Sequence, residues 1–408
     1  MLCERGDELD ALVERVLAHA REYLDKVPVH KSRIQARIAW RDPEGALDIA
    51  IEVLENLGTP VPRRPKKRHV LLGLLRTRRA IGRRKPADLA RLPAMTDRSM
   101  LAAMDVMRSN ASSAYFTDAD LFVLLILKQV QLAATHGNSS FAANAYELYG
   151  MMLCGGFWDC DTGYGFGRLG FEVLERHPAA NLAGKMAMIW GTFVAPWKDP
   201  ARACAEGLLE RWRGAVDGGD LEYAAYMVLQ SLNLAILSGM PLGEVLGRFH
   251  DYSGWLHDTS QLMSIDLFDS WMQCAANLAD PERVIPALRG ERFDLEARLP
   301  GYVEADDRMP IAYASVAEGL LAYFLGDRRR ALASLERAIA HEDRLFSSLL
   351  IPAIHFYHAL LLLSPERGRP DRRARRRVAR SIRRMRRWAR FNPGTFAHKL
   401  ALLEAERA

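Results

Sequence analysis

Apolar residues recur at helical spacing along almost the whole chain. Between residues 46 and 57 they stand at i, i+3, i+4, i+7, i+8 and i+11, which is one face of an amphipathic helix. Gly58, Pro60 and Pro62 then end that helix. The same spacing occurs over 9–20, and further apolar helical stretches cover 121–134, 142–153, 223–237 and 311–325. No run alternates apolar and polar residues as a strand does, so the sequence predicts an all-α fold.

One stretch contains the pattern of a complete helical hairpin. Gly319 lies in a first helix, Gly326-Asp327 makes a turn, and a second helix presents small or apolar residues on one face, namely Ala331, Leu335 and Ala338. Small residues let antiparallel helices cross closely. Weaker signals of this kind occur at Arg41-Asp42, at Trp158-Asp159 and at 238–241. The sequence therefore predicts a tetratricopeptide-like (TPR-like) α-solenoid, a superhelix of antiparallel helix pairs.

The length also favours an array. With 408 residues, the chain is too long for one compact core of the usual size, so it forms either two or three domains or one elongated repeat structure. Proline-rich breaks at 59–65 and 363–370 each lead into a basic segment. We expect N-terminal helix pairs at 1–62, a basic helical hairpin at 63–95, TPR-like repeats at 96–364, and basic terminal helices packed on the array at 365–408.

Charge is segregated along the sequence. The formal net charge is +6, but residues 63–91 hold 12 basic residues and one acidic residue, and residues 366–390 hold 13 arginines and two acidic residues. Outside these two segments, 31 basic residues face 47 acidic ones, a net charge of −16. The sequence thus predicts an acidic body that carries two basic helices, which argues against a uniformly basic nucleic-acid binder. Hydrophobic residues make up 49% and charged residues 26%, which excludes wholesale disorder.

Cysteine usage and the N-terminus bear on location. Five scattered cysteines without a C-x-x-C pair predict neither a disulfide framework nor a zinc site. Residues 1–10 carry charges where a secretory signal would be apolar. The most apolar stretch, 345–363, contains two serines, a proline and two histidines, which favours a helix buried in protein over one in lipid. We therefore expect a cytoplasmic protein.

Motifs of common enzymes are absent from the sequence. Residues 165–170 match G-x-G-x-x-G, but no predicted strand precedes them, so packing of Gly163, Gly167 and Gly170 against another helix is favoured over nucleotide binding. There is no Walker A loop and no kinase, hydrolase or metalloprotease motif. The sequence predicts a protein without catalytic residues, cofactor or metal.

Two polar features have ordinary structural explanations. His355 and His358 stand at i and i+3, a spacing that can hold a metal, but no carboxylate accompanies them, so contacts to a neighbouring helix are favoured. The turn at 136–140 (HGNSS) is expected to end one helix, with Asn138 or Ser139 capping the next.

An arginine-rich helix at 372–390 is the main candidate site. Its apolar residues step by 4, 4, 3 and 3 and form one stripe: Ala374, Val378, Ile382, Met385 and Trp388. Such a helix binds phosphate backbones, anionic lipid or a partner helix; alternatively, its stripe closes the array and its arginines pair with the acidic body. The candidate interaction residues are Arg372, Arg373, Arg376, Arg380, Arg383, Arg387 and Trp388. A second basic amphipathic helix is expected within 63–91.

Several strings together resemble the helical, TPR-like region of large bacterial signalling proteins, in which protein-kinase and STAND or AAA-type ATPase domains precede that region and GAF and histidine-kinase domains follow it. The strings are LENLGTP (54–60), LGLLRTRR (72–79), LPAMTD (92–97), HGNS (136–139), GYGFGRL (163–169), FVAPWKDP (193–200), GDLEYAAY (219–226), HFYHA (355–359) and residues 387–404. The resemblance implies a relay or scaffold and no catalytic residues, and it presents the chain as a free-standing module or a truncated member.

These observations predict a non-catalytic scaffold or relay module that mediates protein–protein interaction in bacterial signal transduction. Its partner is expected to be a protein, such as a kinase or ATPase module. The alternative is a protein that binds nucleic acid or an anionic membrane through the Arg-rich helix 372–390. A weaker third possibility is an enzyme with a pocket inside the array.

Overall fold

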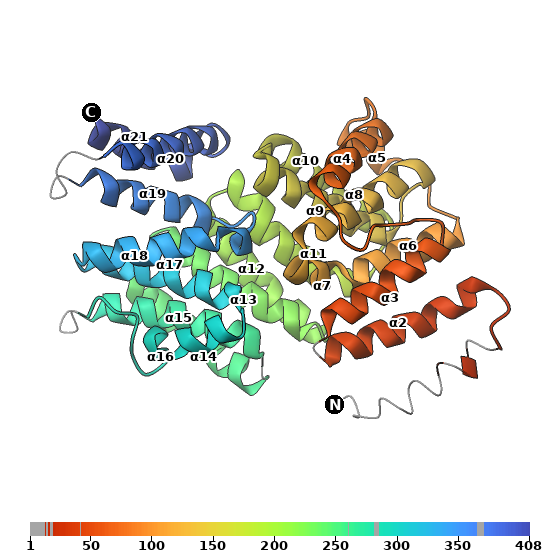
Figure 1. The fold of residues 1–408 in the computed structure, drawn as a ribbon, viewed down its shortest axis with the longest axis horizontal. Helices are drawn as coiled ribbons and strands as arrows, with labels where there is room; N and C mark the ends of the chain where they lie inside the picture. Colours follow the sequence, from red (N-terminus) through yellow and green to blue (C-terminus); the bar gives the residue numbers. More distant parts are fainter. Residues whose placement is uncertain are drawn as a thin grey trace. The chain divides into compact units, whose positions relative to one another are not determined.

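The computed structural model describes residues 13, 15–16, 19–40, 42–259, 261–280, 285–364 and 371–408. These residues form helices joined by turns. Their β-type pairing consists of two isolated bridges, which join Ala94 to Asn138 and Arg289 to Asp294. The predicted all-α fold is confirmed (Figure 1). Most of the helix expected over 9–20 and most of the break expected at 363–370 lie outside the described residues.

The chain divides into two compact units. Unit 1 comprises Met1–Gly150 with Gly165–Ala179, and unit 2 comprises Met151–Tyr164 with Ala180–Ala408. Unit 1 contains α2 (Tyr23–Ala39), α3 (Pro43–Asn56), α4 (Lys67–Ile81), α5 (Pro86–Ala90), α6 (Arg98–Ser109), α7 (Ala111–Thr117), α8 (Ala119–His136), most of α9 (Ser140–Met152) and most of α10 (Cys160–Arg176). The four-segment organisation expected from the sequence stays a prediction.

Helix α8 forms the centre of unit 1. Among the described residues it alone is long and apolar enough to cross a membrane, but 61% of that apolar window is buried. Helices α4, α6 and α7 pack against it. A helix that is apolar on most sides and enclosed by others is a core helix.

The turn after α8 follows the sequence prediction in part. Gly137 ends the helix at φ 106°, and a side chain there would collide with the Pro93 carbonyl. Ser139 caps α9 by accepting the Ala142 amide at 3.3 Å. Asn138 instead donates to the Leu89 carbonyl at 2.8 Å and so holds the C-terminal end of α5.

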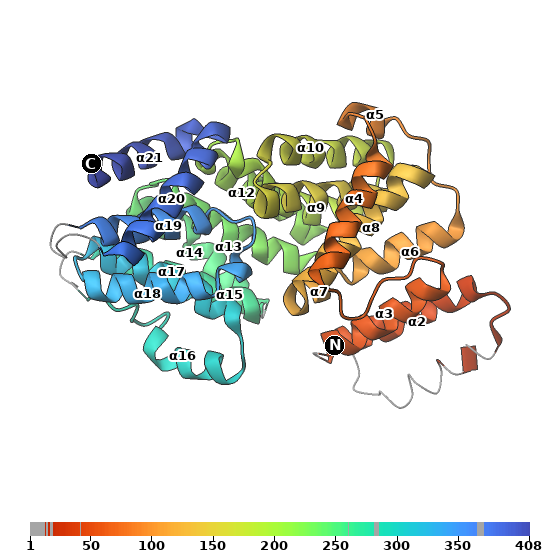
Figure 2. The ribbon, with the colours of Figure 1, turned by 45° about the horizontal axis from the view of Figure 1, so that its top comes forward.

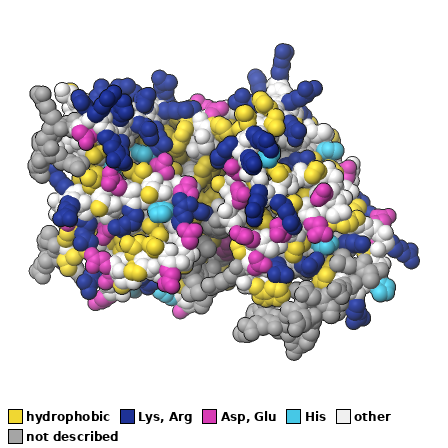
Figure 3. Space-filling view, in the orientation of Figure 1, with side chains coloured by type: hydrophobic (Ala, Val, Ile, Leu, Met, Phe, Trp, Pro, Cys, Tyr) yellow, Lys and Arg dark blue, Asp and Glu magenta, His cyan; other side chains and the backbone are white. Residues whose placement is uncertain are grey.

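Unit 2 contains the remaining helices, which lie mostly as sequential pairs. They are η1 (Leu153–Phe157), α11 (Ala180–Ile189), η2 (Trp190–Val194), η3 (Ala195–Trp197), α12 (Ala201–Asp217), α13 (Leu221–Leu237), α14 (Leu242–Asp258), α15 (Leu262–Ala279), α16 (Leu295–Glu304), α17 (Arg308–Phe324), α18 (Arg328–Ala340), η4 (Glu342–Leu345), α19 (Leu350–Leu363), α20 (Arg372–Phe391) and α21 (Pro393–Arg407). Figure 2 shows α19, α20 and α21 side by side. Charged side chains of both signs are scattered over the visible surface, between hydrophobic and other side chains (Figure 3).

The hairpin α17–α18 has the close crossing predicted from its sequence. Gly326 adopts φ 83° in the turn, and Asp327 caps α18 by accepting the Arg330 amide at 2.9 Å. A Cβ on Gly319 would lie 2.6 Å from Cδ2 of the buried Leu335. Glycine therefore lets these two helices approach at this level without displacing Leu335.

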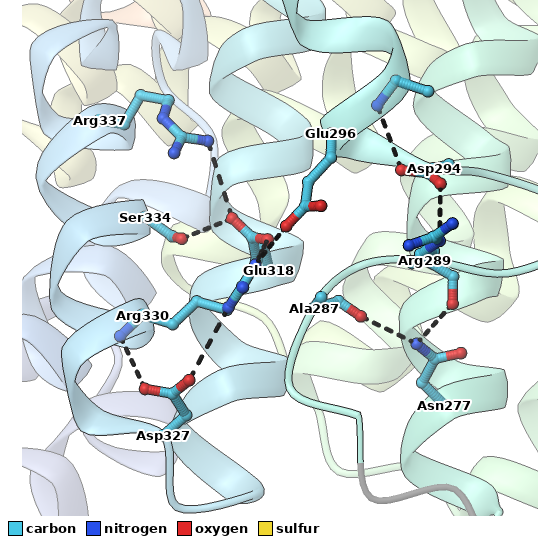
Figure 4. Close-up of polar contacts among 11 residues, drawn as sticks. Asn277, Ala287, Arg289, Asp294, Glu296, Glu318, Asp327, Arg330, Ser334 and Arg337 are labelled. Carbon is cyan, nitrogen blue, oxygen red and sulfur yellow. Dashed lines mark hydrogen bonds and ion pairs between the residues drawn. The ribbon is translucent and has the colours of Figure 1, made fainter.

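A buried carboxylate ties this hairpin together (Figure 4). Glu318 is 3% exposed, and its Oε2 accepts a hydrogen bond from the Ser334 hydroxyl at 2.7 Å. Arg330 reaches Glu318 Oε1 at 3.2 Å and Glu296 of α16 at 3.1 Å. The charge of Glu318 is thus compensated, as burial of a carboxylate requires.

Candidate interaction sites on the C-terminal helices

Helix α20 buries its apolar stripe in unit 2. Val378, Ile382, Met385 and Trp388 are each at most 1% exposed, and the helix packs against α19 and α21. Asp371 starts the helix by accepting the Ala374 amide at 2.6 Å. Because this stripe is covered by protein, α20 has no apolar face left to insert into a lipid bilayer.

Nine of the eleven arginines of α20 fall into two groups. Those on the flanks of the stripe have acidic partners: Arg377 lies 2.5 Å from Glu336, Arg384 lies 3.5 Å from Glu342, and Arg386 lies 2.7 Å from Glu404. These pairs follow the interpretation in which the arginines pair with acidic residues of the body.

The second group faces solvent on the side opposite the apolar stripe. Five predicted site residues step by 4, 4, 3 and 4 along it: Arg372, Arg376, Arg380, Arg383 and Arg387. Arg373 is also exposed, at the edge of this row. Within the described part of the chain none of these six has an ion pair, although Arg387 donates to the Phe157 carbonyl at 2.7 Å. Lys and Arg side chains gather where Figure 1 places α20 and α21 (Figure 3).

A pocket of about 230 Å³ lies at the C-terminal half of this row. Its lining consists of four arginines and two tryptophans: Arg380, Arg383, Arg384, Arg387, Trp158 and Trp388. Trp388, predicted as an interaction residue, is 1% exposed and contributes only a wall of the pocket.

The opposite wall comes from the turn after η1. Trp158 has φ 54°, a left-handed conformation that is uncommon outside glycine. Its ring packs edge-on against Trp388 and Trp197, with centroids 5.2 and 5.3 Å away. Trp197 Nε1 donates to the Ser347 carbonyl at 3.1 Å, and a side chain on Gly155 would collide with Ser347. The wall is therefore fixed by several packed elements.

Arg384, which lines the pocket, also contacts two residues outside it, His355 and Glu342. His355 Nε2 lies 2.9 Å from Glu342 Oε2 and also contacts the Arg384 guanidinium. Burial raises the pKa of the Glu342 carboxyl, but the hydrogen bond with His355 and the charges of His355 and Arg384 outweigh this and lower it. The ionised carboxylate pairs with Arg384.

His355 and His358, the pair singled out in the sequence, both contact acidic residues of unit 2. His358 lies 3.8 Å from Glu336, and burial, with the charge of Arg377 adding to it, lowers the pKa of His358 to about 4. Across the described residues, no group of three or more His, Cys, Asp or Glu side chains is arranged to hold a metal ion.

A second, larger groove lies among α12, α13, α17, α19 and α21, with a volume of about 640 Å³. Its walls are mainly apolar, and the Phe324 side chain is 58% exposed. Three basic residues line it, namely Arg202, His398 and Lys399, and no acidic residue does. Arg202 pairs with Glu206 and Glu244. The half-buried Lys399 donates to the Thr395 carbonyl at 3.0 Å, and burial lowers its pKa.

The G-x-G-x-x-G motif lies inside α10, and a short π-helix and a turn precede it. Gly163, Gly167 and Gly170 are buried, as expected for close packing. The strand-turn-helix context that nucleotide binding requires does not occur there.

The basic segment 63–91 forms α4 and α5 in unit 1. Gly73 and Thr77 face α8, where Thr77 Oγ1 donates to the Leu127 carbonyl at 3.3 Å. Leu71 and Leu75 point outward instead and are 59% and 54% exposed. The apolar residues of this helix therefore do not all mark its buried face.

Comparison with known proteins gives one distant relative. A stretch of 146 residues, 35% of the chain, is 23% identical to "Hybrid signal transduction histidine kinase G" of Dictyostelium discoideum. The aligned stretch spans only 4% of that protein. No protein-family model matches the chain, and no solved structure matches it. The similarity hints at signal transduction, and it gives no support for the TPR-like or bacterial part of the resemblance.

Proposed function

We propose that this chain is a non-catalytic helical-repeat module that binds a protein partner in signal transduction. The order of helix contacts in unit 2 supports a TPR-like solenoid. Helices α13, α15, α17, α19 and α21 each contact the next, and α12, α14, α18 and α20 pair with them. This is the arrangement in which stacked hairpins bury a continuous core and present one layer to a partner.

The main observation behind this proposal is the groove of about 640 Å³. Its size lies within the range of about 300–1,000 Å³ typical of binding pockets, and its walls suit apolar anchors. Lys399 has no carboxylate partner among the described residues, so an acidic residue of an occupant would stabilise its charged form. The occupant is therefore a segment of a partner protein with apolar side chains on one face and an acidic residue beside them.

The location in the cytoplasm and the identity of the partner as a kinase or ATPase module belong to this proposal. The distant similarity to a signal transduction histidine kinase supports the assignment to signalling. The buried stripe of α20 removes the main argument for membrane insertion through that helix.

A display library of random 15-residue peptides tests the groove. We expect selection on the full chain to enrich peptides with apolar residues three or four positions apart and a neighbouring Asp or Glu. Phe324→Asp should weaken their binding about tenfold or more, because it removes an exposed aromatic anchor site. Lys399→Met should reduce the preference for the acidic residue.

Leu402→Asp provides a matched control, because Leu402 is 43% exposed on α21 and does not line the groove. Selected peptides that bind the Phe324→Asp and Leu402→Asp variants equally would show that the groove is not the docking site. Failure to enrich any apolar and acidic pattern would count against the proposed occupant.

A further inference from the structure

We propose that the pocket between Trp158 and α20 binds a phosphate group on a phosphorylated side chain of a partner protein. This site is separate from the apolar groove and does not depend on it. The side chains of four arginines line a space of about 230 Å³. The pocket takes a compact anion with several acceptor oxygens.

Two of the arginines are held in place before any ligand arrives. The ionised Glu342 lies 3.5 Å from Arg384, and the Phe157 carbonyl accepts from Arg387 Nη2 at 2.7 Å. Arg380 and Arg383 are exposed and have no ion pair within the described residues. The site therefore combines preorganised donors with free charge, which lowers the cost of ordering side chains on binding.

The excess of positive charge distinguishes a phosphate from a carboxylate ligand. Glu342 compensates one of the four arginines, so about three positive charges remain at the pocket. A phosphate monoester carries about −1.5 to −2 charges near pH 7 and offers three strong acceptor oxygens. Guanidinium groups match such oxygens with paired N–H donors, whereas a carboxylate leaves more of the positive charge uncompensated.

The walls favour a phosphorylated protein segment over nucleic acid. The volume lies below the range of about 300–1,000 Å³ seen for small-molecule pockets, so it admits an end group and not a whole nucleotide. The ring of Trp388 is buried, and Trp158 packs edge-on against it and against Trp197. Only the half-buried Trp158 could offer a ring to a base, whereas single-strand binding depends on stacking of successive bases.

The rest of the arginine row suits the residues around the phosphate. Arg372 and Arg376 continue from the pocket on the same exposed face of α20. Their charges would attract acidic residues that flank the phosphorylated side chain and would speed the encounter at low salt. Recognition of phosphorylated or acidic segments by arginine clusters is a known mode of peptide binding.

A fluorescein-labelled peptide library with fixed phosphoserine and random flanking residues tests this site by anisotropy on the full chain. We expect the phosphorylated library to bind at least tenfold more tightly than the same library with serine, and inorganic phosphate to compete. The double variant Arg380→Gln/Arg383→Gln should reduce binding at least tenfold. Phe324→Asp, in the apolar groove, should leave it unchanged, which separates this site from the proposed function.

Arg373→Gln/Arg375→Gln is the matched control, because both side chains are exposed on α20, lie outside the pocket and remove the same charge. An equal loss in the control and in the pocket variant would overturn the proposal in favour of diffuse polyanion binding. Tighter binding of a 20-nucleotide single-stranded DNA, or of phosphatidylserine vesicles, than of the phosphopeptides would also overturn it. So would equal binding of the phosphorylated and unphosphorylated libraries.

Discussion

The seam between α17 and α18 allows a sharp test of how closely the hairpin packs. Gly319→Ala adds one methyl group, and that carbon would lie 2.6 Å from Leu335 Cδ2 and 2.7 Å from Cγ. Favourable contact between carbon atoms requires about 3.5–4.0 Å, so the new atom overlaps Leu335 by about 1 Å. Leu335 is fully buried and has little room to move.

Two opposing effects set the magnitude. Replacing glycine by alanine inside a helix stabilises it by about 1 kcal/mol, whereas overpacking a core costs about 1–3 kcal/mol. We therefore expect Gly319→Ala to destabilise unit 2 by about 0–2 kcal/mol. Gly254 of α14 gives the reference, because a Cβ there meets nothing within 4 Å, and Gly254→Ala should stabilise by up to about 1 kcal/mol. The two variants should differ by about 1–3 kcal/mol.

Urea unfolding followed by circular dichroism measures this difference, and both glycines report on unit 2. With a slope of about 3 kcal/mol per M, the two midpoints should differ by about 0.3–1 M. In a Leu335→Ala background the overlap is gone, so Gly319→Ala should become stabilising. If Gly319→Ala raises the midpoint as much as Gly254→Ala does, the close crossing described for α17 and α18 is incorrect.

Three further predictions concern unit 2. Burial lowers the pKa of His358 to about 4 in the folded protein, whereas in the unfolded chain it is about 6.5. As the pH falls, His358 is therefore protonated in the unfolded chain before it is protonated in the folded protein, which favours unfolding. The free energy of unfolding should therefore drop by about 2–3 kcal/mol between pH 7 and pH 4.5. His358→Leu should remove most of that drop, measured by urea unfolding at both pH values. If the drop is unchanged in the variant, His358 is not its cause. Asp327→Ala should cost about 1 kcal/mol through the lost cap on the Arg330 amide, whereas Asp327→Asn should cost little in thermal unfolding. Ser334→Ala should cost about 1.5–3 kcal/mol by removing a hydrogen bond to the buried Glu318, measurable by the same denaturation.

The sequence determined the helices and their turns by itself. Spacing of apolar residues, Asp caps and glycines that adopt positive φ are local features, so they act on the backbone within one or two turns. Gly326-Asp327 and the hairpin around it follow from such signals. The same is true of the apolar stripe on α20, which the structure buries as its periodicity predicted.

Only the tertiary structure decided which face of each helix meets a partner and which charges are neutralised. Leu71 is exposed because Gly73, without a side chain, lets α4 lie against α8. The arginines of α20 look alike in sequence, but the acidic residues that pair with some of them come from three other helical segments. Trp158 stands 230 residues before Trp388, and the pocket exists only where folding brings their turn and helix together. Periodicity is local, whereas a site depends on neighbours that are distant in the chain.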